Sequence, residues 1–397
     1  MKLRYRIHLP GILFILLTVF VGLAAAQRPN NLVVWSFGVL LALILVSGVV
    51  GSSMMRKLQV RRLEVRRAAA GEPLELRYVV ENRSRRRSAF ALQVREVDAR
   101  GRPVAFPMLA AQSFGWINRV GPGASQACDA VLWPATRGVI DLRRIRITSR
   151  FPFGFNDRAM DLDHPHRIVV QPRTHPVREE MFRAVTTGGP GGFGISRRPG
   201  VGEDFYSVRE FKPGDSIRQI AWKRSGISED PLVIQRSMSC PPRLRVVVDL
   251  SREPGDLRFD AGSGVSAEDL EERAITLAAS LASAAEQHGV EFGLTVLGVD
   301  VPSIPVRRGA WHRERVLTAL SVIDLSHPRK PRTPPEPGDE ERCSLVVVHP
   351  AGIDPDLLPD RAWHYSATRI DQVLDLESRS ASRGESRSPV PVGEVLA

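Results

Sequence analysis

Two long, uncharged apolar runs near the N-terminus constrain this chain more than any other feature. The runs cover residues 10–26 and 32–55, and each is close to the roughly 20 residues that a helix needs to cross the hydrocarbon core of a bilayer. The connector, residues 27–31, is polar and contains Pro29, which suits a tight turn at the far membrane surface. The sequence therefore predicts a transmembrane helical hairpin within residues 1–57.

Basic residues gather on one side of this hairpin. Lys2, Arg4 and Arg6 precede the first run, six more basic residues follow the second run between positions 56 and 67, and the connector has only Arg28. Cytoplasmic flanks of membrane helices carry the excess of Lys and Arg. We therefore expect a multi-pass protein of the cell (inner) membrane, with both termini and the soluble domains in the cytoplasm.

A cleaved signal peptide is the alternative for the first run. Residues 23–27, LAAAQ, have the small residues of a cleavage site. The second run would then act as a stop-transfer anchor, and the large C-terminal part would still lie in the cytoplasm.

The net charge of +11 lies entirely in the first 100 residues, which hold 17 Lys and Arg against 6 Asp and Glu, whereas the rest holds 38 of each. Such a basic collar favours anionic membrane lipid as a partner, at about 1 kcal/mol per basic residue near the surface. A nucleic-acid interface would need a basic stripe on a folded domain, so no nucleic-acid partner is expected. The cluster Arg83, Arg85, Arg86 and Arg87 is interpreted as a solvated hairpin turn, with a lipid- or partner-binding patch as the alternative.

Few residues have the spacing of a disulfide or a metal site. Cys128, Cys240 and Cys343 lie far apart without a C-x-x-C spacing, so we expect buried thiols instead of a disulfide framework or a zinc knuckle. Residues 161–166, DLDHPH, could ligate a metal, but two histidines beside a proline favour a surface loop.

The soluble part changes its pattern along the chain. Residues 58–180 alternate apolar and polar side chains between turn signals, which predicts a β-sandwich of the immunoglobulin type. Residues 243–376 alternate apolar strands with helical segments, which predicts an α/β domain with a parallel-rich sheet and helices on both faces. Residues 377–397 have the composition of a disordered tail.

A glycine-rich connector and an unusual motif lie between these domains, in residues 181–242. Residues 189–194 match G-x-G-x-x-G, but no strand runs into them and no helix can follow, so we expect a flexible connector and no nucleotide site. Residues 202–225, GEDFYSVREFKPGDSIRQIAWKRS, mix charged residues with aromatics. They suggest a compact, ion-paired element with aromatic side chains buried in alternation. Its expected role is structural or in binding, with catalysis as the alternative.

This motif resembles the signature of the bacterial family known as domain of unknown function 58. The matching residues are Gly202, Phe205, Arg209, Pro213, Gly214, Asp215, Arg218, Ile220, Trp222, Lys223 and Ser225. Residues 150–155, RFPFGF, and the N-terminal hairpin also resemble the family's layout, so the resemblance spans nearly the whole chain. Phe211 and Ala221 depart from it, because Tyr and a polar residue are usual at those positions.

The C-terminal part of that family resembles a von Willebrand factor A domain, which binds a divalent cation through D-x-S-x-S after its first strand. Here this position reads Asp249-Leu-Ser251-Arg-Glu253, and the third strand ends in His349-Pro350 where an Asp is usual. Oxygen ligands of this kind suit Mg²⁺. We expect a degenerate domain without a metal or other cofactor, with a Mg²⁺ site of Asp249, Ser251 and Glu253 as the alternative.

These features together predict a membrane-anchored cytoplasmic interaction or scaffold protein that is not an enzyme. The family resemblance implies an AAA+ ATPase of the MoxR type as its protein partner, beside membrane lipid. Two alternatives stay open. One is an enzyme at the inner membrane face with its site in residues 202–225, and the other is a divalent-cation-dependent adhesion module.

Overall fold

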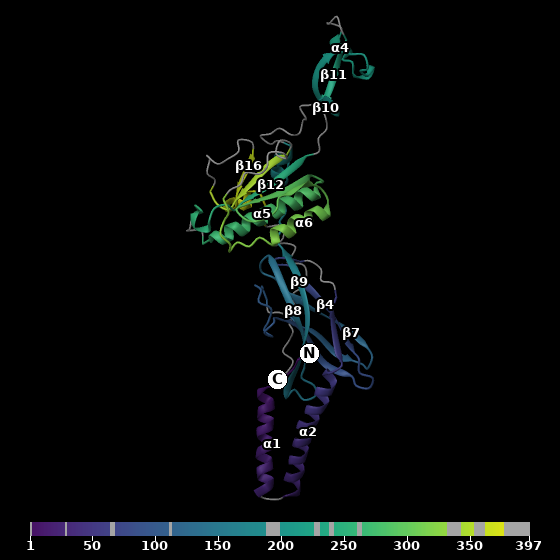
Figure 1. The fold of residues 1–397 in the computed structure, drawn as a ribbon, viewed down its shortest axis with the longest axis vertical. Coiled ribbons are helices and arrows are strands. Elements are labelled where there is room, and N and C mark those ends of the chain that lie inside the picture. The colour runs from purple at the N-terminus through teal and green to yellow at the C-terminus, as the bar shows by residue number, and fades with distance from the viewer. Residues whose placement is uncertain are drawn as a thin grey trace. The chain divides into compact units, whose positions relative to one another are not determined.

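The computed structural model describes residues 2–27, 30–63, 68–110, 113–187, 199–225, 231–237, 242–259, 264–331, 343–352 and 362–376. The chain divides into two compact units, Met1–Gln171 and Pro172–Ala397, and each is described by itself (Figure 1). The tail at 377–397 and the glycine-rich residues 188–198 were expected to be disordered or flexible, and they lie outside the described residues.

Two apolar helices open the first unit. Helix α1 spans Leu9–Gln27 and helix α2 spans Asn31–Met55, and each is long and apolar enough to cross a membrane. At 1.5 Å per residue they measure about 28 Å and 38 Å, against a hydrocarbon core of about 30 Å. The Asn30 side chain caps α2 by accepting a hydrogen bond from the Leu32 N–H. The two predicted apolar helices are therefore confirmed, with boundaries within a few residues.

A strand that the sequence analysis did not anticipate precedes α1. Strand β1, Lys2–Ile7, pairs antiparallel with strand β9, Asn156–Gln171, from Lys2 opposite Asp161 to Ile7 opposite Asn156. The alternation KLRYRI is a period-two strand pattern, but it was interpreted only as a charged flank. The chain before the hairpin and the chain after it thus share one sheet.

Two sheets form a β-sandwich in this unit (Figure 1). One has the order β1-β9-β8-β5-β6, with β3 on β9, and the other has the order β2-β4-β7. The remaining strands are β2 (Leu58–Arg62), β3 (Ala68–Ala69), β4 (Leu74–Asn82), β5 (Ala89–Val97), β6 (Gly115–Val120), β7 (Ser125–Leu132) and β8 (Gly138–Ser149). Alternate residues of both sheets meet in one core, as the period-two pattern predicted.

A buried polar network lies inside the sandwich. The Arg62 guanidinium donates to both carboxylate oxygens of Glu96 at 2.8 Å, and the Tyr78 hydroxyl donates to the same carboxylate at 2.9 Å. The Arg62 and Glu96 side chains are almost fully buried. The Arg62 guanidinium also donates to His164 O at 3.3 Å, but the carboxylate of Glu96 supplies the opposite charge, so the loss of Glu96 would leave a buried cation without its ion-pair partner.

The second unit is built on a five-stranded sheet with the order β14-β13-β12-β15-β16. Its strands are β12 (Arg243–Asp249), β13 (Glu291–Leu297), β14 (Ile304–Arg307), β15 (Ser344–His349) and β16 (Ala362–Ser366). Four strands are mutually parallel, and β14 is antiparallel to β13. The predicted parallel-rich sheet is present, and the order of connection reverses between β12, the central strand, and its neighbour β15.

Four helical segments of this unit contribute to one core. They are α3 (Glu179–Thr187), α5 (Ala267–Gln287), α6 (Ala310–Ser321) and the 3₁₀ segment η6 (Ala367–Gln372), and they share a cluster with Val246, Leu294 and Val346. The residues that point to the other face, Val247, Leu297 and Val347, form a separate small cluster. Among the described residues, no helix contributes to this second cluster, so helices on both faces stay a prediction. Strand β14 runs antiparallel to β13 and precedes α6. The connection from β13 to the parallel strand β15 therefore contains a strand as well as a helix.

Capping residues mark both ends of α5. Ser266 and Asp269 form a capping box at its start, and Gly289 follows the helix with a φ of +67°. The expected domain boundary at residues 180/181 falls inside α3. Helix α3 packs in the α/β core through Phe182 and Val185, so this helix belongs to the second unit.

We predict that Glu96→Ala lowers the free energy of unfolding by about 3–5 kcal/mol, because it leaves the Arg62 guanidinium buried without its partner. Denaturant unfolding of the detergent-solubilised protein measures this change. Asp129→Ala removes a solvent-exposed cross-strand pair with Arg77 and should leave the transition midpoint unchanged. Equal effects of the two variants would contradict a special role for the buried network.

Candidate functional site

The signature motif forms a small two-stranded sheet of its own. Strand β10, Pro199–Glu210, pairs antiparallel with strand β11, Leu232–Ser237, with irregular register on both sides of Phe205. The 3₁₀ segment η1, Ile217–Gln219, and the short helix α4, Trp222–Ser225, lie between the two strands. The residues expected to be part of a connector therefore include a folded hairpin, described here by itself.

An ion pair fixes the turn that follows β10. Both terminal nitrogens of Arg209 donate to the Asp215 carboxylate, at 2.5 and 2.6 Å, and the Lys212 N–H donates to it at 2.8 Å. Gly214 has a φ of +108°, which its lack of a Cβ allows. The Arg209 guanidinium and the backbone bond hold the pKa of Asp215 below its usual range. A general acid or base needs a pKa near the working pH, so this geometry suits a structural carboxylate.

Three large apolar side chains of the hairpin are exposed. Phe205, Ile217 and Trp222 have exposed fractions of 58%, 69% and 65%. A concave surface of about 650 Å³ is lined by Phe205, Ala221, Trp222, Lys223 and Ile234. The expected alternate burial of aromatics is thus wrong for Phe205 and Trp222, whereas the expected ion pairing is confirmed for Arg209 and Asp215. Exposure of these side chains makes the hairpin a candidate binding surface, which we call the aromatic patch: Phe205, Ile217, Ala221, Trp222, Lys223 and Ile234.

The other signature residues take varied positions. Gly202 lies in β10, Pro213 begins the turn, and Ser225 ends α4. The Arg218 side chain on η1 is exposed, close in sequence to Ile217 of the aromatic patch. Basic Arg218 and Lys223 therefore accompany the exposed apolar side chains.

The candidate metal residues lie after β12 but have separate partners. Asp249 Oδ1 accepts hydrogen bonds from the Ser251 hydroxyl at 2.5 Å and from the Ser251 N–H at 3.2 Å. Glu253 instead accepts a hydrogen bond from the Arg329 N–H at 2.8 Å. The structure thus brings Asp249 and Ser251 together and directs Glu253 toward a different segment. Within the described residues, no group of three or more His, Cys, Asp or Glu is placed to hold a metal ion.

Two histidines lie next to Asp249, close to the carboxyl ends of the parallel strands. His349 Nδ1 lies 3.6 Å from Asp249 Oδ2, and His349 Nε2 lies 3.1 Å from His364 Nδ1. The His349 ring uses opposite nitrogens for these contacts, so the three side chains form a line and do not converge on one point. His364 was missed from the sequence, because only the pairing of β16 with β15 brings it beside His349. The position beyond the carboxyl ends of β12 and β15 could have been anticipated, since ligands of open α/β sheets bind there.

Asp249 is the strongly perturbed carboxyl group of this line. Burial alone would raise its pKa, but hydrogen bonds from His349 and Ser251 outweigh burial and lower the pKa to about 2. The charged form is therefore stabilised by the fold.

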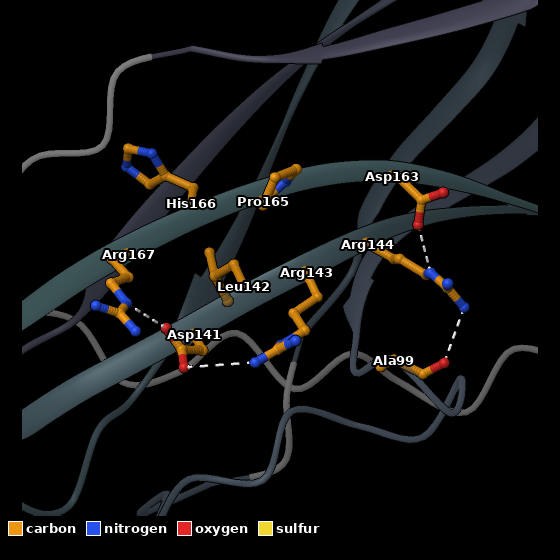
Figure 2. Close-up of a pocket in the computed structure, with 9 residues that line it drawn as sticks. All are labelled: Ala99, Asp141, Leu142, Arg143, Arg144, Asp163, Pro165, His166 and Arg167. Carbon is orange, nitrogen blue, oxygen red and sulfur yellow. Dashed lines mark hydrogen bonds and ion pairs between the residues drawn. The ribbon is translucent and has the colours of Figure 1, made fainter.

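The second candidate metal cluster, residues 161–166, lies in strand β9 and not in a surface loop. Figure 2 shows part of it beside an open groove of about 700 Å³ on β8 and β9. Asp161 accepts from Arg146 at 2.6 Å, and Asp163 accepts from Arg144 at 2.5 Å. Both carboxylates are thus engaged by cross-strand arginines. This arrangement fits a ladder of ion pairs between two strands better than a metal site.

Comparisons with known proteins add one family match. A family model described as "Protein of unknown function DUF58" matches residues 207–342, which include most of the hairpin and much of the α/β sheet. No curated protein matches the chain. The family match agrees with the resemblance drawn from residues 202–225.

Two solved structures show weak likeness. One is the ASH/PapD-like domain 7 of human CEP192, at 15% identity and a TM-score of 0.19, covering 30% of this chain and 87% of that chain. The other is the GH20 exo-β-N-acetylglucosaminidase from Vibrio harveyi in complex with N-acetylglucosamine. It has 6% identity and a TM-score of 0.17, covering 74% of this chain and 56% of that chain. At these TM-scores neither likeness bears on fold or function.

We predict that Asp249→Asn flattens the acid limb of the stability profile. A carboxyl with a folded pKa of about 2 and an ordinary value of 3.8 stabilises the fold above pH 3.8, by about 2 kcal/mol, and this contribution is lost as the pH falls toward 2. Thermal unfolding between pH 6 and about pH 2 measures it. Identical slopes in the wild type and the variant would show that Asp249 is not stabilised in the folded protein.

Proposed function

We propose that this protein is a membrane-anchored, non-enzymatic docking platform whose aromatic patch binds a protein partner. The observation that carries this proposal is the exposure of Phe205, Ile217 and Trp222 on an element whose turn is fixed by the Arg209–Asp215 pair. The pair closes residues 209–215, which join Phe205 on β10 to Ile217 and Trp222, and a preorganised segment loses less conformational freedom on binding.

The chemistry of the aromatic patch favours protein binding over catalysis. Exposed apolar groups with polar neighbours mark protein interaction sites, and Trp is enriched among the residues that dominate binding energy. An isolated two-stranded sheet is at best marginally stable, so a partner that covers its apolar face would also stabilise it. Asp215, the carboxylate most suggestive of catalysis, is held charged by its arginine.

The anchoring we propose has the soluble domains and both termini in the cytoplasm. Pairing of β1 with β9 supports a hairpin topology, because residues 2–7 and the sandwich must lie on the same side of the membrane. The basic flanks favour the cytoplasmic side. Cleavage after residue 26 would remove β1 from the edge of its sheet, so the pairing also favours retention of the first helix.

The partner we propose is an AAA+ ATPase of the MoxR type, as the family resemblance implies. We further propose that the sandwich is of the immunoglobulin type and that the α/β unit is a degenerate von Willebrand factor A-like domain. The separate partners of Asp249 and Glu253 support a domain that acts without a metal ion.

Trp222→Ala should weaken capture of the ATPase by at least about tenfold, because loss of a central Trp anchor typically costs 2 kcal/mol or more. The measurement is affinity purification from native membranes in mild detergent, with and without ATP, and quantification of the co-purified ATPase. Trp311→Ala is the matched control, since Trp311 on α6 is also highly exposed but lies outside the aromatic patch. Absence of any ATPase in both nucleotide conditions, or equal losses in the two variants, would contradict the proposal.

A reporter that fluoresces only in the cytoplasm should be active when fused to residue 397 and also when fused before residue 1. Both fusions are expected to be active because the two membrane helices return the chain to its starting side. An exported phosphatase fused at the same two places provides the control and should stay inactive. An active phosphatase at either end would contradict the topology.

A further inference from the structure

The loop between β8 and β9 lies against the membrane helices. The rings of Phe155 and Phe14 are stacked with centroids 4.2 Å apart, and Phe155 O accepts a hydrogen bond from the His8 N–H. Phe153, in the same loop, is partly exposed beside Phe155. An aromatic loop of the sandwich is therefore continuous with the lipid-facing surface of α1.

A second contact joins β9, close to this loop, to helix α2. Arg158, which is almost fully buried, donates from its guanidinium to the carbonyls of Ser47 and Gly48. Gly51 makes room for this contact, because a Cβ there would lie 1.3 Å from Arg158 Nη1. The backbone carbonyls of α2 thus accept hydrogen bonds from a buried guanidinium, which ties β9 to this helix.

The depth of both contacts follows from helix geometry. Counted from the far ends of the helices at 1.5 Å per residue, Phe14 lies about 20 Å and Ser47 about 24 Å along the span. With a hydrocarbon core of about 30 Å, both contacts fall within about 10 Å of its near boundary. Interfacial elements of membrane proteins are immersed to this depth.

Exposed basic side chains lie at the same end of the sandwich, on two neighbouring segments. The Arg83 N–H donates to Lys57 O at 3.0 Å, so the arginine loop of residues 83–87 lies beside the end of α2. Exposed basic side chains on these two segments are Arg56, Lys57, Arg85, Arg86 and Arg87, and Arg83 pairs with Glu81. The interpretation of this cluster as a mere solvated turn does not account for its place at the membrane end.

We propose that the β-sandwich is itself a lipid-binding domain: residues 153–155 insert into the bilayer interface, and the arginine loop binds anionic lipid headgroups. This inference rests on the proposed anchoring by α1 and α2 and extends it from the helices to the folded domain. The aromatic loop contributes apolar burial, and the arginines contribute about 1 kcal/mol each on an anionic surface.

Depth measurements on the full-length protein test the aromatic loop. After Cys128, Cys240 and Cys343 are replaced by Ala, a nitroxide is attached at Phe153→Cys in vesicles that contain phosphatidylglycerol. Its collision rate should be higher with oxygen than with a water-soluble nickel chelate. A nitroxide at Arg150→Cys should also collide more often with oxygen, but by a smaller margin.

Leu109→Cys is the matched control. Leu109 is also exposed, and its N–H bonds to Trp133 O at the end of the sandwich opposite α2. That end lies about 26 Å from Asn82, because eight residues of β4 separate them at about 3.3 Å each. The nitroxide at Leu109→Cys should favour the nickel chelate.

Leu16→Cys in α1 distinguishes a failure of the proposed loop insertion from a failure of the proposed membrane anchoring. An aqueous reading at Phe153→Cys together with a lipid reading at Leu16→Cys would overturn the inference and leave the anchoring intact. Aqueous readings at both positions would overturn the anchoring as well.

Headgroup binding is tested by lipid retention from mixed phosphatidylglycerol and phosphatidylcholine vesicles. Arg85→Ser/Arg86→Ser should reduce the excess of phosphatidylglycerol retained by the purified protein, by about fivefold per arginine. Arg100→Ser/Arg102→Ser is the charge-matched control, since these residues follow β5 at the far end of the sandwich, and it should change little. Equal losses in the two double variants would overturn the headgroup assignment.

Discussion

The pairing of β1 with β9 is the constraint on which the rest of the first unit depends. It ties six residues before the hairpin to a strand that begins about a hundred residues after it. The helices α1 and α2 must therefore leave and re-enter the same end of the sandwich. The contacts of Arg158 with α2 and of Phe155 with Phe14 then join the folded domain to both helices. The hairpin is thus a structural part of the sandwich and not a flexible tether.

Elements with strong periodicity were predictable from the sequence. Uninterrupted apolar runs identified the membrane-length helices, period-two patterns identified the sandwich strands, and the change to alternating strands and helices identified the parallel-rich sheet. Strand β1 was missed because its three basic residues were weighed as charges for topology, although they alternate with Leu3, Tyr5 and Ile7. The placement of α6 was missed because the reversal by β14 depends on a short strand that pairs only in the tertiary structure.

The contacts at the candidate sites were only partly predictable from the sequence. The mix of charged residues predicted an ion-paired element, and the structure shows one such pair, Arg209 with Asp215, which closes a turn of a few residues. Burial of Phe205 and Trp222 was inferred from composition alone, and it failed because, among the described residues, no second sheet packs on the two strands of the hairpin. His364 joins His349 and Asp249 only through the register of β16, which no local pattern reveals. Pairing between strands far apart in the sequence, more than local propensity, therefore determines which polar side chains meet at the candidate sites.

The proposal that the aromatic patch is a docking surface on a membrane-anchored platform can be tested in intact cells. The experiment is site-specific photocrosslinking from a photoreactive amino acid at position 222, with position 311 as the control. We expect one dominant protein adduct from position 222, identified by mass spectrometry as an AAA+ ATPase, and no such adduct from position 311. Adducts that are absent at position 222, or the same at both positions, would contradict the claim.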